Sequence, residues 1–120
     1  MTSGARPDRV AEEFREILAE EIPRLKDPRV GFVTVTRVEV TPDLRRAVVY
    51  YTVLGEEGER RATRAGLRSA RPHLRTELGH QVRLKFTPEL RFEEDEAMTN
   101  VARVEELLRK LQQGGEDAPG

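Results

Sequence analysis

The sequence predicts an α+β domain in which helices cover one face of a three-stranded sheet. Segments whose apolar residues recur at helical spacing alternate along the chain with segments of alternating, often β-branched residues. The expected order is helix, strand, strand, helix, helix, strand, helix, and helices on one face of a sheet bury both kinds of apolar surface. The chain has 120 residues, which suits a single domain with its own core.

The first helix is expected to open at Pro7 and Asp8, after a short polar tail. Pro23 should fray or bend its last turn, because proline lacks the backbone N–H that an inner turn requires. The apolar positions at helical spacing are Val10, Phe14, Ile17, Leu18, Ile22 and Leu25.

Two strands should follow, joined by a hairpin-like connection at TPDLR. In the first, FVTVTRVEV, apolar and polar residues alternate, which places Arg37 and Glu39 on one face. The second, RAVVYYTVL, is apolar on both faces and is therefore expected at the centre of the sheet. At least one of Tyr50 and Tyr51 should then lie in the core.

Two short helices and a third strand are expected next. Residues 59–70 suit one helix, and Pro72 suits the first turn of another that stops at Gly79. QVRLKF then alternates apolar and basic residues and predicts a strand with one basic face. Pro88 tolerates only an edge or a bulge, so this strand should lie at a margin of the sheet or be interrupted there.

The last helix is predicted from apolar residues at helical spacing, namely Val101, Val104, Leu107, Leu108 and Leu111. The acidic EEDEA segment before it is expected to be a solvated helix start, where negative charge suits the helix dipole. The expected domain spans residues 8–112, between a flexible tail at 1–7 and a disordered tail at 113–120.

The sequence offers few residues for catalysis or metal binding. Cysteine is absent, which excludes disulfides, a thiolate nucleophile and zinc-thiolate sites. Ser69 is a single weak candidate for a Ser-His-Asp arrangement, and no acidic cluster at metal-ligand spacing lies between His73 and His80. We therefore expect a protein that is not an enzyme and needs no cofactor or metal.

The sequence also favours a cytoplasmic protein. No apolar segment approaches the roughly 20 residues of a membrane span. The first ten residues, MTSGARPDRV, lack the apolar region of a signal peptide.

The formal net charge of −1 hides a strong asymmetry. Residues 60–91 contain nine basic and two acidic residues, whereas residues 93–120 contain three basic and eight acidic ones. A local positive field of this kind attracts polyanions.

Arginines in this basic third are the candidate RNA-binding residues. Arg64, Arg68, Arg71 and Arg75 surround the Ala70-Arg71-Pro72 junction between the two expected helices, where guanidinium groups and a helix start would suit phosphate. Arg83 and Lys85 of the expected strand would extend this basic surface. For any one of these arginines, the alternative is a weak surface ion pair with Glu59, Glu77 or the acidic tail.

Two further observations limit the kind of RNA recognition. Gly55-Glu56-Glu57-Gly58 matches the Gly-x-x-Gly loop with which KH domains clamp a nucleic-acid backbone, but its glutamates would repel phosphate, so we interpret it as a turn. The paired sheet aromatics of an RRM are absent. Recognition should therefore depend on phosphate contacts and RNA shape rather than on splayed bases.

Four segments of the chain carry specific motifs, namely DPRVGFVTVTRVEVTPDLRRAVVYYTVLG, LRSARPHLRTELG, VRLKFTPELRFEED and ARVEELLRKL. The most specific pieces are Asp27-Pro28-Arg29, Thr34-Val35-Thr36, Pro42-Asp43, and Pro88-Glu89-Leu90-x-Phe92 followed by Asp95. In order and with the expected spacing, these segments resemble the bacterial ribosome-binding factor A family.

The resemblance implies a type II KH-like fold without catalytic activity. It also implies binding to the small (30S) ribosomal subunit and its 16S rRNA, a role in late maturation that includes processing of the rRNA 5′ region, and assembly GTPases as further partners. We expect a monomer. In the family the helix junction carries Ala-x-Gly, so Pro72 would replace a free kink with a fixed one.

The residues leave one alternative open. A small protein-protein adaptor would dock a partner through its C-terminal helix or a sheet edge, without direct RNA contact. In that case the basic third would serve solubility alone.

Overall fold

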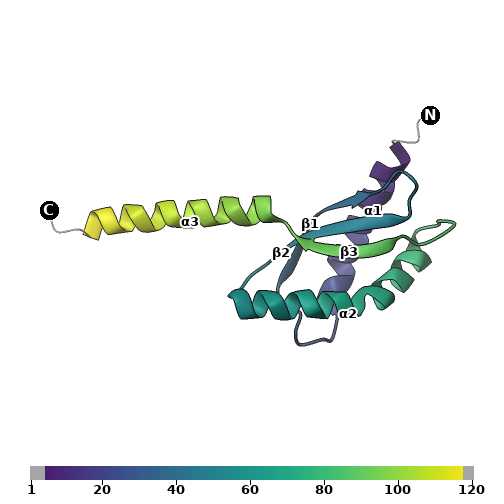
Figure 1. Cartoon of the computed structure of the whole chain (residues 1–120), viewed down its shortest axis with the longest axis horizontal. Coiled ribbons are helices and arrows are strands. Elements are labelled where there is room, and N and C mark those ends of the chain that lie inside the picture. The colour runs from purple at the N-terminus through teal and green to yellow at the C-terminus, as the bar shows by residue number, and fades with distance from the viewer. Residues whose placement is uncertain (1–4, 118–120) are drawn as a thin grey trace.

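The structure is a computed structural model that describes residues 5–117. Figure 1 shows a sheet covered on one side by helices, with a last helix that projects away from it. This architecture confirms the predicted α+β class. The elements are α1 (Ala5–Glu21), the 3-10 turn η1 (Ile22–Arg24), β1 (Val33–Val40), β2 (Arg46–Val53), α2 (Glu57–Gln81), β3 (Glu89–Glu94) and α3 (Glu96–Asp117).

The sheet has the strand order β1-β2-β3, so β2 is central as predicted. β1 pairs antiparallel with β2, whereas β3 pairs parallel with β2 after the crossover through α2. A register shift between Val35 and Arg37 interrupts the alternation of β1. Because of this bulge, Val35 and Val38 are both buried although they are three residues apart.

The core lies between the sheet and the helices α1 and α2. Val10, Phe14, Leu18 and Ile22 of the first helix and η1 are buried, which confirms the helical spacing predicted there. Pro23 lies in η1, where α1 has ended, as expected for a proline. The sheet contributes Val35, Val38, Ala47, Val49, Tyr51 and Leu90, and α2 contributes Leu67, Leu74 and Leu78.

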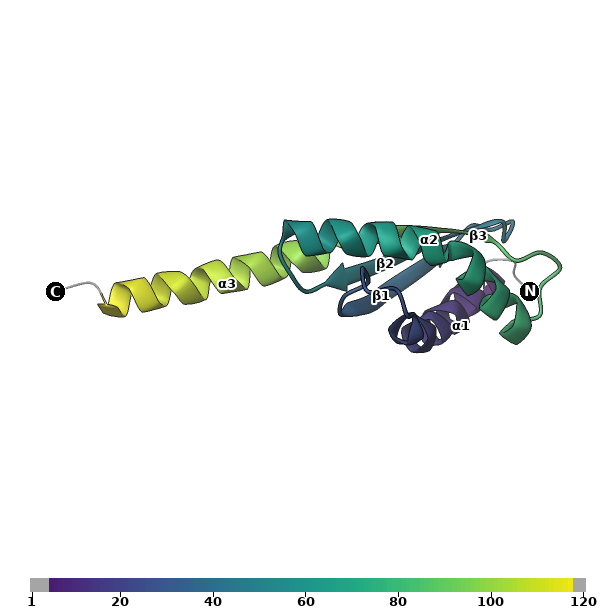
Figure 2. The ribbon, with the colours of Figure 1, turned by 90° about the horizontal axis from the view of Figure 1, so that it is seen from below.

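The prediction of two helices separated at Pro72 is wrong, because α2 is one helix with Pro72 inside it. Proline has no N–H to donate to the carbonyl of Arg68, four residues earlier. The Arg71 Nε donates to that carbonyl instead, at 3.3 Å. The ribbon bends in this part of α2 (Figure 2) and continues to Gln81, beyond the end expected at Gly79.

The predicted third strand at residues 82–86 is also misplaced. These residues form the α2–β3 loop, and the strand begins at Glu89. In a strand, Val82 and Phe86 would point to the same face. Val82 is buried and Phe86 is exposed, so the apolar and basic residues of this segment alternate for reasons of loop packing. Pro88 directly precedes β3, which is an edge strand as expected next to a proline.

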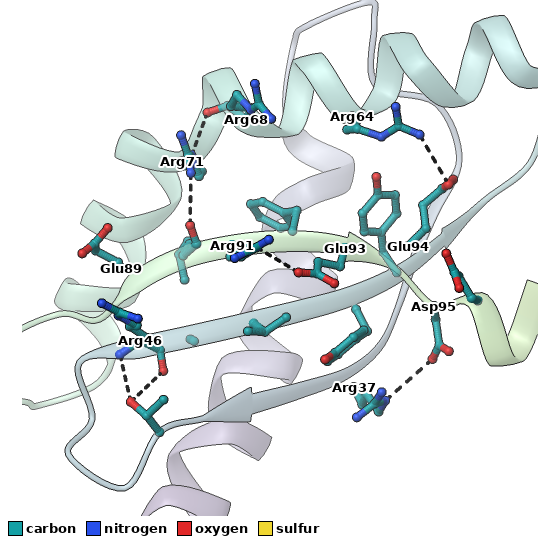
Figure 3. A pocket seen from close by; sticks show the side chains of 18 of the residues that line it. Arg37, Arg46, Arg64, Arg68, Arg71, Glu89, Arg91, Glu93, Glu94 and Asp95 are labelled. Carbon is teal, nitrogen blue, oxygen red and sulfur yellow. Dashed lines mark hydrogen bonds and ion pairs between the residues drawn. The ribbon is translucent and has the colours of Figure 1, made fainter.

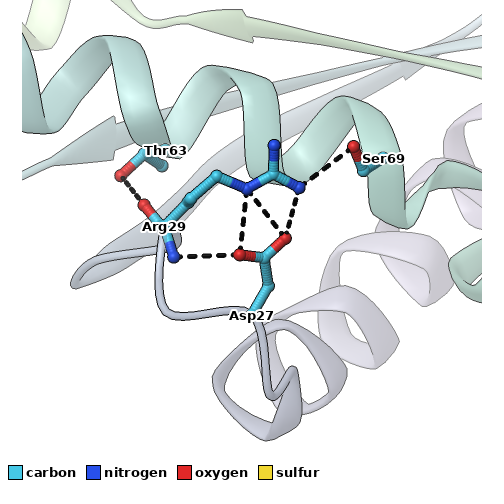
Figure 4. Close-up of polar contacts among 4 residues, drawn as sticks. All are labelled: Asp27, Arg29, Thr63 and Ser69. Carbon is cyan, nitrogen blue, oxygen red and sulfur yellow. Dashed lines mark hydrogen bonds and ion pairs between the residues drawn. The ribbon is translucent and has the colours of Figure 1, made fainter.

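A turn between η1 and β1 fixes α2 against the rest of the fold (Figure 4). Asp27 accepts hydrogen bonds from the backbone and side chain of Arg29, and the Arg29 guanidinium also donates to Ser69 of α2 at 3.2 Å. Thr63 donates its hydroxyl to the Arg29 carbonyl and accepts the Gly31 N–H at 3.1 Å. These contacts give the Asp27-Pro28-Arg29 segment a structural role.

The acidic segment before α3 is not a solvated helix start. Glu93 and Glu94 belong to β3, and Asp95 is 5% exposed. The Asp95 carboxylate accepts a hydrogen bond from Thr36 at 2.6 Å, which ties the start of α3 to the bulge of β1. Only Glu96 lies in the first helical turn, where its charge suits the dipole.

The projecting α3 departs from the prediction that all helices cover the sheet (Figure 1). Its apolar side chains Val104, Leu107, Leu108 and Leu111 are each more than half exposed. Both terminal helices extend past the domain bounds expected from the sequence, since α1 begins at Ala5 and α3 ends at Asp117.

Candidate nucleic-acid interface

Three of the predicted arginines line an open groove of about 1120 Å³ that follows the edge strand β3 beside α2. Figure 3 shows Arg64, Arg68 and Arg71 above β3, with charged side chains of β3 below them. Their spacing of four and three residues places them on one side of the helix. The arginines expected around a junction of two helices therefore lie along one side of a single helix.

Arg64 is partly neutralised by the acidic end of β3. Its guanidinium lies 3.7 Å from the Glu94 carboxylate, whose side chain is 13% exposed. Arg60 forms two hydrogen bonds with the same carboxylate, each at 3.0 Å. These hydrogen bonds, opposed by burial, lower the pKa of Glu94, so the carboxylate stays charged at neutral pH.

Arg71 and Arg75 connect α2 to the segment that leads into β3. Arg71 donates to the Leu90 carbonyl at 3.4 Å, besides its bond to Arg68. Arg75 donates to the carbonyls of Pro88 and Thr87 at 3.0 and 2.8 Å. Neither arginine has a carboxylate partner in the described part of the chain, and both stabilise the fold through these contacts with backbone carbonyls.

Arg68 differs from its neighbours. Its side chain is exposed, and within the described residues its guanidinium forms neither an ion pair nor a hydrogen bond. It lines both the groove and a smaller cavity beside it that also contains Ser69, Arg71, Pro72 and Arg75. Arg68 is therefore the arginine of this helix side that is best placed to receive a phosphate.

The structure corrects two features of the predicted basic surface. No helix begins at Pro72, so the N–H groups expected to face a phosphate there are absent. Arg83 and Lys85 are exposed in the α2–β3 loop rather than in a strand, and neither lines the groove beside Arg68. The four arginines predicted as site residues therefore all lie in α2, whereas Arg83 and Lys85 lie beyond the end of this helix.

Basic residues on the helix-free face of the sheet were not among the predicted site residues. Arg46 and Arg91 line the same groove as Arg68, and Arg37 lies on this face with its guanidinium 3.8 Å from the centre of the Tyr50 ring. Arg91 pairs with Glu93 at 2.8 Å. The sequence could have indicated these arginines, because they alternate with inward-facing apolar residues and must therefore lie on the opposite face of the sheet.

Tyr51 belongs to the core rather than to the interface. Its side chain is fully buried, and within the described residues its hydroxyl has no hydrogen-bond partner. Burial, assisted by the nearby Glu94 charge, raises the pKa of Tyr51. The prediction that one tyrosine of the pair lies in the core is confirmed.

Other kinds of site find little support in the described residues. No group of three or more histidine, cysteine, aspartate or glutamate residues among them could hold a metal ion. Ser69 accepts a hydrogen bond from Arg29. No helix in this part of the chain has the length and apolar character needed to cross a membrane.

The fold and the groove define a class of protein, a KH-like α+β domain with an arginine-lined helix beside its edge strand. Within this class the chain belongs to the ribosome-binding factor A family, because the family model described as "Ribosome-binding factor A" matches residues 6–108. A "Ribosome-binding factor A" of Geobacter sulfurreducens is 44% identical over 108 residues, which are 89% of this chain and 92% of the relative.

Solved structures agree with this assignment. The crystal structure of ribosome-binding factor A from Thermus thermophilus matches with a TM-score of 0.66 and 30% identity, covering 73% of this chain and 94% of that one. A Thermus thermophilus homology model fitted into a cryo-EM map of a 30S complex matches with a TM-score of 0.60 and 32% identity, covering 72% and 91%. The predicted family and KH-like fold are confirmed.

Proposed function

We propose that this protein binds the small ribosomal subunit through its 16S rRNA and assists late maturation, including processing of the rRNA 5′ region. Membership of the ribosome-binding factor A family carries the proposal. The Thermus thermophilus homology model was fitted into a map of a complex between that factor and the 30S subunit, which supports the same partner here.

The arginine side of α2 is the proposed RNA contact. Arg68, Arg71 and Arg75 have no carboxylate partner among the described residues, so their charge is available to phosphates. Arg64 shares Glu94 with Arg60 and contributes less free charge. Arg83 and Lys85 extend the basic surface from the α2–β3 loop.

Co-sedimentation with ribosomal particles tests the partner. We expect the protein to sediment with free small subunits and poorly with complete ribosomes, because an assembly factor should leave the mature particle. Equal binding to both particles would contradict a role in assembly. Assembly GTPases, as further partners, should then alter the occupancy of the protein on free small subunits.

The contact itself is tested by Arg68→Gln. This change removes one exposed charge and no side-chain contact, so the melting temperature should stay constant. The slope of log affinity against log salt should fall in magnitude by about 0.7 to 0.9 if Arg68 contacts one phosphate. The control is Arg9→Gln, which removes an exposed charge from α1, away from the groove.

Processing of the rRNA 5′ region is tested in cells that lack the native factor. Complementation with the unchanged chain should remove the 5′-extended 16S precursor. The variant Arg68→Glu should leave more precursor than Arg9→Glu at equal protein levels. Equal processing with both variants would place the functional contact elsewhere.

The alternative function, a protein-protein adaptor, is favoured by one observation. The exposed apolar residues of α3, Val104, Leu107, Leu108 and Leu111, form an amphipathic helix side without cover among the described elements. An apolar interface would be nearly insensitive to salt, whereas phosphate contacts weaken steeply as salt rises. A flat salt titration would therefore favour the adaptor.

A further inference from the structure

We propose that Phe86 at the tip of the α2–β3 loop stacks on an unpaired RNA base, while Arg45, Arg83 and Lys85 contact the adjoining phosphates. These four residues are called the loop corner below. The inference rests on the proposed function, because the RNA would belong to the small subunit. It adds recognition of a single-stranded base, whereas the sequence predicted recognition by phosphate contacts and RNA shape alone.

The Phe86 side chain is exposed on a loop whose other apolar residues are packed. It is 61% exposed, although its loop neighbours Val82 and Pro88 are buried and Leu84 is half-buried against the core. Burial of an aromatic side chain of this size normally stabilises a fold. The exposure of Phe86, on a loop whose other apolar residues are packed, therefore marks a position suited to contact with a partner.

The base of the loop is fixed by contacts with two other elements. Arg75 of α2 holds the carbonyls of Thr87 and Pro88 at 2.8 and 3.0 Å. The Glu89 N–H donates to the Arg45 carbonyl at 2.9 Å, which joins the loop to the β1–β2 turn. Both segments lie at the end of the molecule opposite α3 (Figure 1). The position of Phe86 is thus largely preorganised, which reduces the entropy lost on binding.

Two cations lie near the exposed ring, and a third is exposed in the same loop. The Arg45 guanidinium lies 5.9 Å and the Lys85 ammonium 5.8 Å from the ring centre. Arg83 is also exposed, and none of the three cations has an ion pair among the described residues. A single exposed aromatic ring with two unpaired cations beside it fits a nucleotide better than an apolar protein surface, because stacking and phosphate contact are satisfied together.

The nearest acidic residue of the turn does not cancel this charge. The Asp43 carboxylate accepts hydrogen bonds from the Thr41 hydroxyl at 2.7 Å and the Arg45 N–H at 3.1 Å. These bonds lower the pKa of Asp43 and hold its carboxylate in the turn. The Arg45 guanidinium remains available at the ring.

Tyr50 provides a comparison within the same chain. Its ring is covered by Arg37 at 3.8 Å, and its hydroxyl donates to Glu39 at 3.3 Å. The cations near Phe86 stand about two ångströms further from the ring centre, at the margin of cation–π attraction. A base can therefore approach the Phe86 ring without breaking a close contact, which is not the case at Tyr50.

The test measures binding of the full chain to a single-stranded adenosine octanucleotide and to a blunt RNA duplex of eight base pairs. We expect the single strand to bind more tightly, because its bases can stack on an exposed ring. Phe86→Ala should weaken its binding about five- to 150-fold, the range measured for losing one stacked base. Phe86→Trp should retain the affinity.

Two matched variants make the result specific. Phe86→Leu keeps apolar area but removes the aromatic face, so it should bind the octanucleotide almost as poorly as Phe86→Ala. Phe32→Ala removes another exposed phenylalanine, 83% exposed at the other end of the β1–β2 hairpin, and should change nothing. Arg45→Gln and Lys85→Gln should each reduce the salt slope without abolishing the preference for single strands.

Defined outcomes would overturn the proposal. Unchanged affinity in Phe86→Ala, equal binding of strand and duplex, or full affinity in Phe86→Leu would each exclude base stacking, and the last would indicate an apolar protein contact. If small-subunit binding needs Arg68 but not Phe86, the proposed function stands, and the proposal that the loop corner contacts this RNA is wrong. Absence of small-subunit binding would refute the proposed function, while the octanucleotide still decides the role of Phe86.

Discussion

At the scale of single residues, the arginines of α2 show that one residue type has two roles in the same helix. Arg71 and Arg75 donate to backbone carbonyls at the start of β3 and hold the edge strand against the helix. Arg68 makes no such contact and is available to a ligand. Replacing all three together would therefore lower stability and binding at once, whereas Arg68 alone separates the two effects.

Gly66 allows the turn before β1 to approach α2. A Cβ at this position would lie 2.7 Å from Val30 Cγ2, inside the distance that real contacts permit. Gly66→Ala should therefore destabilise the fold by about 1 to 3 kcal/mol in urea unfolding, because the turn must shift. Gly58→Ala is the control, since nothing lies within 4 Å of its added Cβ. Equal unfolding midpoints for both variants would show that the turn moves freely.

The Asp27 carboxyl should make stability depend on pH. Hydrogen bonds from the Arg29 side chain and backbone lower the pKa of Asp27 to about 2. Because the folded pKa lies below the unfolded value of about 3.9, this contribution is present above pH about 4 and is lost as pH falls toward 2. Asp27→Asn should thus be less stable than the unchanged chain at pH 7.

The stability difference between these two proteins should shrink as the pH falls from about 4 to about 2. A carbon-13 NMR titration of Asp27 provides a direct measurement, with a midpoint expected at about 2. In Arg29→Gln the midpoint should rise toward the ordinary value. A midpoint near 4 in the unchanged chain would show that Arg29 does not hold this carboxylate in solution.

At the scale of elements, strands and helices differed in how far the sequence predicted them. The first strand followed from local alternation, the central place of β2 followed from its apolar residues on both faces, and α1 followed from apolar spacing. Each of these patterns belongs to a single element. The break at Pro72 was predicted from proline's missing N–H, but the Arg71 side chain satisfies the carbonyl left without its usual partner. Such a compensation depends on side-chain geometry and has no signal in residue spacing.

The third strand illustrates a second limit. Residues 82–86 have the alternation of a strand, but β3 must run parallel to β2 and therefore starts only after the chain has returned from the end of α2. Likewise, the sequence predicted the groove arginines of α2 but not those of the sheet. Glu94 contacts both Arg60 and Arg64 because β3 lies beside α2, and residue spacing does not show this. Tertiary contacts decide both features.

The bend of α2 is tested by replacing Pro72 with glycine or alanine. Both changes restore an N–H that can donate to the Arg68 carbonyl and release Arg71. Pro72→Gly should lower the free energy of unfolding modestly, because glycine gives the unfolded chain more conformational freedom. Pro72→Ala should be more stable than Pro72→Gly by about 1 kcal/mol, as helix propensity predicts.

Urea unfolding measures this order, and hydrogen exchange of the new amide at residue 72 shows whether it is bonded. If Pro72→Ala is the less stable of the two, the burial of Leu74 and Leu78 must require the bend more strongly than alanine favours a straight helix. Small-subunit binding by the two variants then shows whether the bend also positions the arginine side of α2.

At the scale of the whole molecule, the projecting α3 makes the chain elongated. Its extents are 67 × 37 × 17 Å, and its radius of gyration is 17.9 Å. A compact chain of this length would have a radius of gyration of about 14 Å. The difference follows from a helix whose described apolar side chains are exposed instead of packed on the sheet.

Small-angle scattering of the full chain should therefore give a radius of gyration near 17.9 Å for a monomer, the state that we expect for this protein. The mass from the same experiment separates an extended monomer from a dimer joined through α3. A chain truncated after Arg103 should have a radius close to the compact value and an unchanged melting temperature, because none of the described side chains that it loses belongs to the core. A full-length monomer near 14 Å, destabilised by the truncation, would instead mean that α3 folds back and buries Val104, Leu107, Leu108 and Leu111 against the body.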